Sequence, residues 1–520
     1  MKKILKLLIV AILTIAMVGC SGDSSEETPA VDQTYIVAIQ GEPNSLNPDA
    51  IADDYGYEIY QNVFSRLVKL NNNFEILPDL ASSWEYSEDG LTLTFHLNEG
   101  VKWHDGEAFT SADVVWTFNA IINNSGVMSG AFVNVSSVTA PDDYTVVLTL
   151  SKVDGSLLGN IAWYGTFILP EHIYNDGGDW TTNAAAETPI GTGPYKFSSW
   201  EKGTSITLVR NDDYFVTTPT LDKVVYTIIP DETTAYQAWL NDEVDEIYTY
   251  PETELATLEE SGEYNFVNQL WPSPWYMAFN MDADYEGVIS DINVRKAITM
   301  AIDNTQISTL ATAGIFPASE YYIPVVYDYA LNDDAKRPAY DPEAAIALLE
   351  ASGYTRGDDG YFFTINIKPV TGMDDVATVI QAQLKEIGIN VEIVSLEYAI
   401  WTEQVFTNHD YDLATLGGFQ GPDILGTGRR WTTTGDINVL GYSNATVDAL
   451  YEQAQSVSDL TELAAIFSQI QVELAKDMPY LLLVDYNQKT PYKKYISGHP
   501  AIDAIDKCGF SELTYVVLSE

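Results

Sequence analysis

The sequence predicts an α/β protein with more than one domain, and three observations carry this prediction. The chain has 520 residues, whereas a single hydrophobic core stops growing at roughly 250 to 300 residues. Hydrophobic residues make up 46% of the chain and charged residues 19%, a balance that supplies ample core and differs from that of a disordered chain. Segments of strand-like and helix-like periodicity are mixed along the chain, which is typical of α/β packing.

The first residues have the pattern of a secretion signal. Three lysines precede an apolar run, Leu7 to Val18, which is shorter than the ~20 residues that a membrane-spanning helix needs. Met17-Val18-Gly19-Cys20 resembles the bacterial lipobox. We therefore expect residues 1–19 to be a lipoprotein signal peptide, Cys20 to be lipidated, and residues 20–31 to form a flexible acidic tether. The alternative is an ordinary secretory signal with an incidental cysteine.

A β-hairpin that leads into a helix is the first predicted element of the folded part. Apolar and polar residues alternate from Leu91 to Leu97, which predicts a strand with one buried face. Asn98-Glu99-Gly100 is a turn sequence. Thr110 and Asp113 have capping-box spacing, and an apolar stripe follows from Val114 to Ile121, so we expect a helix to begin there.

Helices and a strand are also predicted in the second half of the chain. Asp291 is placed to cap a helix, and Asp341-Pro342 to Gly353 has an N-cap, a first-turn proline and a terminal glycine. Residues from Asp374 to Gly388 form a helical stripe, and Val391 to Leu396 reads as a strand. Helix followed by strand at this spacing indicates α/β packing.

The charge and the cysteines exclude several functions. Lys+Arg 25 against Asp+Glu 75 gives a net charge of −50, which repels phosphate backbones and excludes nucleic-acid binding. The acidity indicates either a self-repelling soluble surface or attraction of cationic ligands. Cys20 and Cys508 are far apart in sequence, and the pattern contains neither a disulfide framework nor a Cys/His zinc motif.

The common catalytic signatures are absent from the sequence. It contains no phosphate-loop, nucleophile-elbow or zinc-protease motif. The glycine-rich stretch Gly191 to Pro194 lacks the Lys-Ser of a phosphate loop, and Pro194 removes an amide donor, so we interpret it as a structural turn. The five histidines are dispersed, and we expect no metal and no cofactor.

A series of short motifs runs along most of the chain. They are Pro78 to Trp84, Phe95 to Gly106, Phe109 to Val114, Pro189 to Tyr195, Arg210 to Tyr214, Ala278 to Asn280, Val294 to Ile298, and Gly441 to Asp448. In order and spacing they resemble the extracytoplasmic solute-binding proteins of the peptide/nickel ABC importer family.

This resemblance implies a two-lobed, periplasmic-binding-protein-like fold of the large type II-like form, with an extra domain inserted in the first lobe. The base of the first lobe would comprise residues 32–55, 193–279 and 488–520, the inserted domain residues 56–192, and the second lobe residues 280–487. The lobes would close over a ligand, and permease subunits would recognise the closed form.

The resemblance also implies a ligand-binding aspartate in a Gly/Asp/Pro-rich loop. Here that loop is Gly417 to Asp423, and Asp423 would pair with the α-ammonium of a peptide. A solvated turn aspartate without a ligand is the alternative. Dipeptide-binding members have an arginine for the ligand carboxylate near the position of Thr371-Gly372, which this chain lacks. Arg429 and Arg430 could supply that bidentate contact instead, with a surface role as the alternative.

Four aromatic residues fall in segments that border the cleft in related proteins. They are Trp431, Trp401, Trp275 and Tyr55. They would give the cleft apolar walls or stack on sugar rings, and ordinary core packing is the alternative.

The leading hypothesis is a non-enzymatic, monomeric lipoprotein that captures oligopeptides and delivers them to the permease and ATPase subunits of an importer. It would be lipid-anchored on the outer side of the bacterial plasma membrane, at the cell surface or in the periplasm. The same transport role for oligosaccharides, nickel or other small solutes is an alternative. A secreted hydrolase and a signalling or adhesion lipoprotein are alternatives of a different class.

Overall fold

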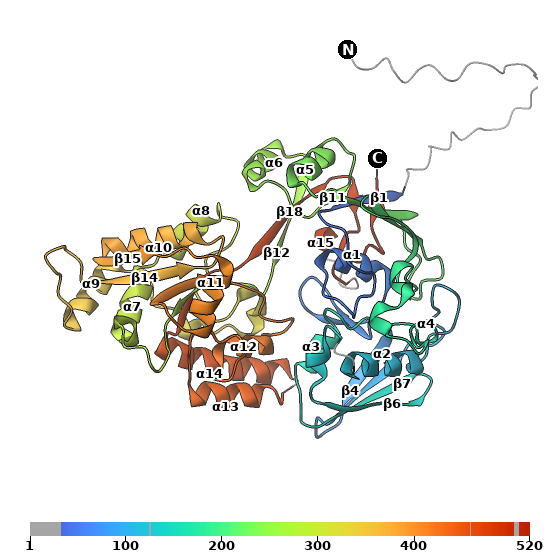
Figure 1. Ribbon diagram of the computed structural model, residues 1–520, viewed down its shortest axis with the longest axis horizontal. Coiled ribbons are helices and arrows are strands. Elements are labelled where there is room, and N and C mark those ends of the chain that lie inside the picture. The colour runs from blue at the N-terminus through green and yellow to red at the C-terminus, as the bar shows by residue number, and fades with distance from the viewer. Residues whose placement is uncertain (1–32, 124–125, 458, 504–508, 520) are drawn as a thin grey trace, which may run out of the picture.

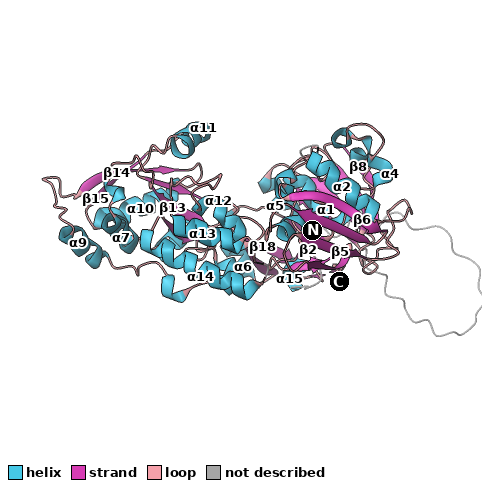
Figure 2. Ribbon diagram, turned by 90° about the horizontal axis from the view of Figure 1, so that it is seen from below, coloured by secondary structure: helices cyan, strands magenta, loops and turns pink. Residues whose placement is uncertain are grey.

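The computed structural model describes residues 33–123, 126–457, 459–503 and 509–519. Cys20 and Cys508 lie outside these residues, so the lipidation of Cys20 stays a prediction. The chain forms two α/β lobes joined by a narrow link (Figure 1), and Figure 2 shows helices packed against strands in both of them. None of the described helices has the length and apolar character needed to cross a bilayer.

The first lobe is built on a five-stranded mixed sheet with the order β11-β1-β10-β9-β8. Its strands are β1 (Thr34–Ile39), β8 (Tyr195–Glu201), β9 (Ser205–Arg210), β10 (Lys223–Ile228) and β11 (Glu246–Ile247). The helices of this part are α1 (Asp54–Val63), α5 (Glu232–Leu240), α6 (Leu255–Ser261) and α15 (Pro500–Asp503). Strand β1 pairs in parallel with β10 and β11. The C-terminal β20 (Val517–Leu518), paired with β19 (Ile496–Ser497), completes this core.

A second sheet of the first lobe, with the order β4-β5-β7-β6, is antiparallel throughout. Its strands are β4 (Ala81–Tyr86), β5 (Thr92–Leu97), β6 (Val135–Asp142) and β7 (Thr145–Leu150), and the short pair β2 (Val68–Leu70) and β3 (Ile76–Pro78) lies beside it. The helices here are α2 (Ser111–Asn123), α3 (Leu157–Ile161) and α4 (Glu171–Tyr174). Helix α2 packs on this sheet through its apolar face.

The predicted strand, turn and capping box are confirmed, but the predicted hairpin is wrong. Strands β4 and β7 occupy both edges of β5, and in the described residues the segment after the turn forms only an isolated bridge between Lys102 and Ala108. Strand β5 occupies Thr92–Leu97, and Gly100 has a φ of 76° in the turn that follows. The Thr110 hydroxyl accepts a hydrogen bond from Ala112 N (3.3 Å), and Asp113 accepts one from Thr110 N (2.9 Å). These two bonds satisfy backbone donors at the start of α2.

The second lobe is a five-stranded sheet with helices on both faces. The order is β15-β14-β16-β13-β17, with strands β13 (Trp275–Phe279), β14 (Phe363–Pro369), β15 (Ile389–Ile393), β16 (Leu413–Leu416) and β17 (Tyr480–Val484). One face packs on α7 (Ile292–Ala301), α8 (Asn304–Ala311), α9 (Pro342–Ala351) and α10 (Asp374–Glu386). The other packs on α11 (Tyr398–Thr402), α12 (Gly428–Trp431), α13 (Ala445–Ala454) and α14 (Leu460–Asp477).

The predicted helices of this lobe are confirmed, and one predicted strand is shifted. Asp291 caps α7 by accepting from Asn293 N (2.8 Å), and Asp341 caps α9 by accepting from Ala344 N (2.9 Å). Strand β15 begins at Ile389 rather than at the predicted Val391. The reason is that Gly388, with a φ of 86°, reverses the chain directly after α10, so pairing with β14 starts at once.

Two antiparallel strands carry the chain between the lobes. Strand β12 (Tyr264–Leu270) leads into β13, and β18 (Asn487–Lys493) returns from β17. They pair over their whole length, from Tyr264 opposite Lys493 to Leu270 opposite Asn487, and form the link seen in Figure 1. We propose the predicted limits near residues 192, 279 and 487 as domain boundaries. The fourth is placed after α1 instead of at the predicted residue 55, because α1 packs on the core of the five-stranded sheet.

The glycine-rich stretch at residue 191 is a structural turn, as interpreted from the sequence. Gly193 N donates to Val63 O (2.9 Å). A Cβ added to Gly191 would lie 1.8 Å from the same oxygen, so the backbones of the two segments approach too closely for any side chain. This contact fixes the end of α1 against the start of β8.

Candidate functional site

Two cavities lie at the junction of the lobes and share Trp163 as a wall. The first, here called the hinge cavity, has about 450 Å³ and is lined by the first lobe and the linking strands β12 and β18. The second, here called the loop cavity, has about 530 Å³ and is lined by the α3 region of the first lobe and by residues 419–455 of the second. Trp163 stacks on Phe419 of the opposite lobe, with ring centroids 5.1 Å apart.

The Trp163 ring belongs to an aromatic cluster drawn from distant parts of the chain. Trp271, which follows β12, stacks on Phe510 at 5.6 Å, and Phe74 meets Phe510 edge-on at 5.2 Å. Trp163 lies 6.3 Å from Trp271 and 5.7 Å from Phe510. A rigid apolar wall of this kind suits a ligand with apolar surface.

Asp423 lines the loop cavity, at the end of a glycine-rich loop that follows β16. Gly418 and Gly421 in this loop have φ values of 131° and 117°, which only glycine adopts without strain. The Asp423 side chain is half-buried and caps the turn Ile424–Thr427. Its Oδ1 accepts from Leu425 N (2.9 Å) and from Gly426 N (3.3 Å).

The other oxygen of Asp423 faces the opposite lobe. A Cβ placed on Gly159 of α3 would lie 2.5 Å from Oδ2, so glycine leaves room for the carboxylate. The pKa of Asp423 is raised to about 7, mainly by burial and to a smaller extent by the charge of Asp154, while the two backbone N–H groups act in the opposite direction. Because burial destabilises the anionic form of this carboxyl group, a cation that binds beside it would stabilise that form.

The two neighbouring arginines differ in availability. Arg429 lines the loop cavity but forms a bidentate pair with Asp436, at 2.9 and 2.6 Å. Arg430 is 6% exposed, donates to Phe419 O (3.1 Å) and lies below the glycine loop, with no carboxylate within ion-pair distance in the described residues. The loop at Thr371 and Gly372 carries no arginine.

Trp275 and Tyr55 lie near the cavities without lining them. Trp275 is half-buried, packs edge-on against Phe316 at 4.8 Å, and lies under the Gly417 end of the glycine loop. Tyr55 is 42% exposed at the start of α1 and covers Gly41.

Trp401 and Trp431 line neither the hinge cavity nor the loop cavity. Each is 1% exposed and belongs to the core of the second lobe. Trp431 stacks on Tyr480 with centroids 3.8 Å apart, and the Trp401 indole donates to Lys368 O (3.0 Å). The expectation that these rings wall the cleft is therefore corrected in favour of core packing, because their surfaces are already covered by protein.

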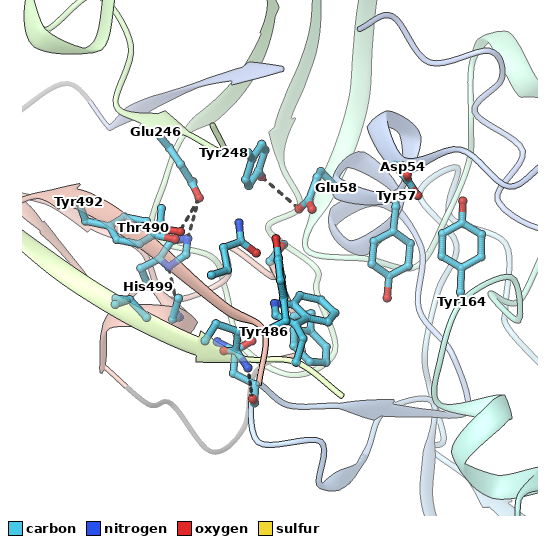
Figure 3. A pocket seen from close by; sticks show the side chains of 18 of the residues that line it. Asp54, Tyr57, Glu58, Tyr164, Glu246, Tyr248, Tyr486, Thr490, Tyr492 and His499 are labelled. Carbon is cyan, nitrogen blue, oxygen red and sulfur yellow. Dashed lines mark hydrogen bonds and ion pairs between the residues drawn. The ribbon is translucent and has the colours of Figure 1, made fainter. Parts of the chain in front are cut away.

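The hinge cavity contains ionisable residues that the sequence reasoning missed (Figure 3). Glu246 on β11 is 2% exposed and accepts from Tyr35 OH (2.9 Å) and Tyr492 OH (3.4 Å). Glu58 on α1 accepts from Tyr248 OH (3.1 Å). The pKa of Glu58 is raised to about 7, mainly by burial and to a smaller extent by the charge of Glu246.

His499 completes this cluster. Its side chain is 3% exposed, its Nδ1 accepts from Ala501 N (3.2 Å), and its Nε2 lies 3.5 Å from Glu246 Oε1. The residues come from segments near 58, 246 and 499, so no spacing in the sequence brings them together. A hint is the position of Glu246 in β11, which pairs with Val37 of β1. Val37 is buried, so a glutamate opposite it is unusual.

Within the part of the chain that the structure describes, no three His, Cys, Asp or Glu side chains are placed to hold a metal ion. His172 pairs with Asp105 at 2.8 Å, and His409 pairs with Asp282 at 2.6 Å. Both pairs lie outside the two cavities.

Comparisons with known proteins agree with this architecture. Residues 75–436 match the sequence profile of the family described as bacterial extracellular solute-binding proteins, family 5 Middle. The oligopeptide-binding protein AppA of Bacillus subtilis (strain 168) is 29% identical over 532 residues, which covers 96% of this chain and 97% of AppA. The dipeptide-binding protein of Escherichia coli (strain K12) is 25% identical over 518 residues, with 93% and 94% of the two chains covered.

Solved structures give the same result. AppA from B. subtilis in complex with a nonapeptide superposes with a TM-score of 0.69 at 28% identity, covering 94% of this chain and 99% of AppA. The ABC transporter substrate-binding protein CtaP of Listeria monocytogenes has a TM-score of 0.82 at 25% identity, covering 94% of this chain and all (100%) of CtaP. These matches confirm the predicted resemblance, and the chain belongs to the family 5 bacterial extracellular solute-binding proteins, with a substrate-binding role.

Proposed function

We propose that this protein captures oligopeptides between its lobes and passes them to the permease and ATPase subunits of an ABC importer. The observation that carries the proposal is the position of Asp423. Its half-buried carboxylate lines a cavity of about 530 Å³ formed by both lobes, and its Oδ2 is directed across the junction. A peptide α-ammonium placed there would gain a charge-assisted hydrogen bond when the lobes close.

Two further observations favour a peptide. Arg430 is a buried guanidinium without a carboxylate partner in the described residues, and it lies under the same loop, where a ligand carboxylate would be attracted. Arg429 is less suited to bind a ligand carboxylate, because its guanidinium already donates two hydrogen bonds to Asp436. Among the relatives, AppA is named as an oligopeptide-binding protein, and its solved structure holds a nonapeptide.

The proposed role is binding and delivery without chemical conversion, by a monomer held outside the plasma membrane through a lipid on Cys20. The membrane anchor follows from the lipobox resemblance alone. It would keep the protein close to the permease while leaving the lobes free to close.

Native mass spectrometry of the purified protein tests the proposal. We expect mass additions that disappear on unfolding and that tandem mass spectrometry identifies as peptides. Incubation of the protein with a recovered peptide should return that peptide intact. A carried-over oligosaccharide or metal complex, or cleavage of the peptide, would contradict the proposal.

A further inference from the structure

We propose that the hinge cavity binds a positively charged side chain, lysine or arginine, of the captured peptide. This inference rests on the proposed function and deepens it by adding a preference for basic residues. The site is separate from Asp423, which lines the loop cavity on the other side of Trp163.

The charge of the cavity wall is the first argument. Asp54, Glu58 and Glu246 line it, and none of its described lining residues is lysine or arginine. The nearest lysines of β18 are already paired, Lys489 with Glu259 and Lys493 with Asp242. A cavity whose wall carries carboxylates and no compensating cation attracts a cationic group.

The hydrogen bonding of the cavity is the second argument. Buried polar atoms in finished protein cores are nearly always paired. His499 is more than nine-tenths buried, and its Nε2 has no hydrogen-bond partner in the described residues, with only the longer 3.5 Å approach to Glu246. Trp271, also a lining residue, has an indole N–H without a partner in the described residues. Because His499 Nδ1 already accepts a hydrogen bond, its Nε2 is a donor, like the Trp271 indole. These donors need acceptors such as the backbone carbonyl oxygens of a bound peptide, so they indicate an occupant, and the carboxylates of the wall select its charged side chain.

The shape and the aromatic lining are the third argument. The cavity has about 450 Å³, which accommodates a long side chain together with adjoining backbone. Trp163, Trp271 and Tyr248 supply ring faces. Aromatic faces contact the methylene stem of lysine or arginine and attract its charged end, whereas the carboxylates fix that end.

The test uses the full chain and pools of synthetic hexapeptides. Each pool carries lysine, ε-acetyl-lysine or norleucine at one position and mixed uncharged residues elsewhere, and the peptides retained by the immobilised protein are quantified by mass spectrometry. At pH 8 we expect lysine at one position to be enriched at least about tenfold over ε-acetyl-lysine. Norleucine should behave like ε-acetyl-lysine, because both lack the charge.

Glu58→Gln removes one charge from the wall with little change of shape, and it should lower the lysine preference to about threefold or less. The matched control is Glu201→Gln, which removes the same formal charge from an exposed position on β8 and should leave the preference unchanged. Thermal denaturation shows whether each variant is folded.

The lysine preference should also fall between pH 8 and pH 6. The pKa of Glu58 is about 7, so its charge is lost as the pH drops through that value. The groups that face Glu58 come from several elements: Tyr248 and Glu246 from the β11 segment, Tyr226 from β10, Tyr492 from β18, His499 before α15, and Ser511 from the C-terminal segment.

Equal retention of lysine and ε-acetyl-lysine at every position would overturn this inference and leave the proposed function standing. Retention of no peptide from any pool would overturn the proposed function, and this inference with it.

Discussion

A defined pH dependence of peptide binding follows from the position of Asp423. Its pKa is about 7, so the carboxyl is about 9% ionised at pH 6 and about 76% ionised at pH 7.5. A peptide α-ammonium with a pKa of about 7.9 is about 99% protonated at pH 6 and about 72% at pH 7.5. Because the pair needs both charged forms, the affinity for a peptide with a free N-terminus should rise about sixfold from pH 6 to pH 7.5.

The substitution Asp423→Asn should remove this dependence. Asparagine can still accept from Leu425 N and Gly426 N, so the turn keeps its cap. The loss of the charge should weaken binding of a free peptide by about 2 to 5 kcal/mol, which is tens-fold to several-thousand-fold in Kd. An N-acetylated peptide should bind the native protein weakly and lose little more in the variant, so the two changes should be non-additive.

Isothermal titration calorimetry of both proteins with both peptides at both pH values measures the full cycle. The peptides should contain no lysine or arginine, so that the hinge cavity adds no charge contact.

The folded-state pKa of Asp423 is raised, so its charged form destabilises the fold as the pH rises toward 7. The variant should therefore have a Tm at pH 7.5 no lower than that of the native protein. Additive penalties, a pH-independent affinity, or tighter binding of a neutral oligosaccharide would refute the reasoning.

Three other predictions concern the anchor, the motion and the turn. Cys20→Ala should release the protein from the membrane fraction, and continued tight association with a cleaved signal would contradict lipidation. Small-angle scattering should show a smaller radius of gyration with saturating peptide, and an unchanged value would speak against closure. Gly191→Ala, whose Cβ would lie 1.8 Å from Val63 O, should lower the free energy of unfolding in urea by about 2 to 4 kcal/mol. Gly130→Ala meets no atom within 4 Å and should change it by less than about 0.5 kcal/mol.

Local signals in the sequence were sufficient for individual elements. The capping box at Thr110 and the caps at Asp291 and Asp341 were predicted because the partners lie within three residues of one another. The start of β15 was misplaced by two residues, because register depends on pairing with β14 rather than on composition.

The site could be predicted only in part. Asp423 was singled out because its glycine-rich loop resembles the ligand-binding loop of dipeptide-binding members of the family; it lines the loop cavity, and its role in binding stays a prediction. The roles of Trp401 and Trp431 could not be decided, because an aromatic residue suits a core and a cleft equally well. The cluster of Glu58 and Glu246 was missed, because contact between residues so distant in the chain leaves no periodicity or spacing to detect.

The return of the chain through β18 sets the order in which the protein can be completed during synthesis. All strands of the second-lobe sheet fall between residues 275 and 484, so this lobe is available to fold before synthesis ends. The first lobe lacks β18 until residue 493 has been made. Asn62, at the end of α1, bonds to Ser511 and Leu513, so its partners emerge last. Contacts between the first and last segments of a chain form slowly. A nascent chain therefore carries an incomplete first lobe until its final thirty or so residues arrive, so this lobe is completed after the second.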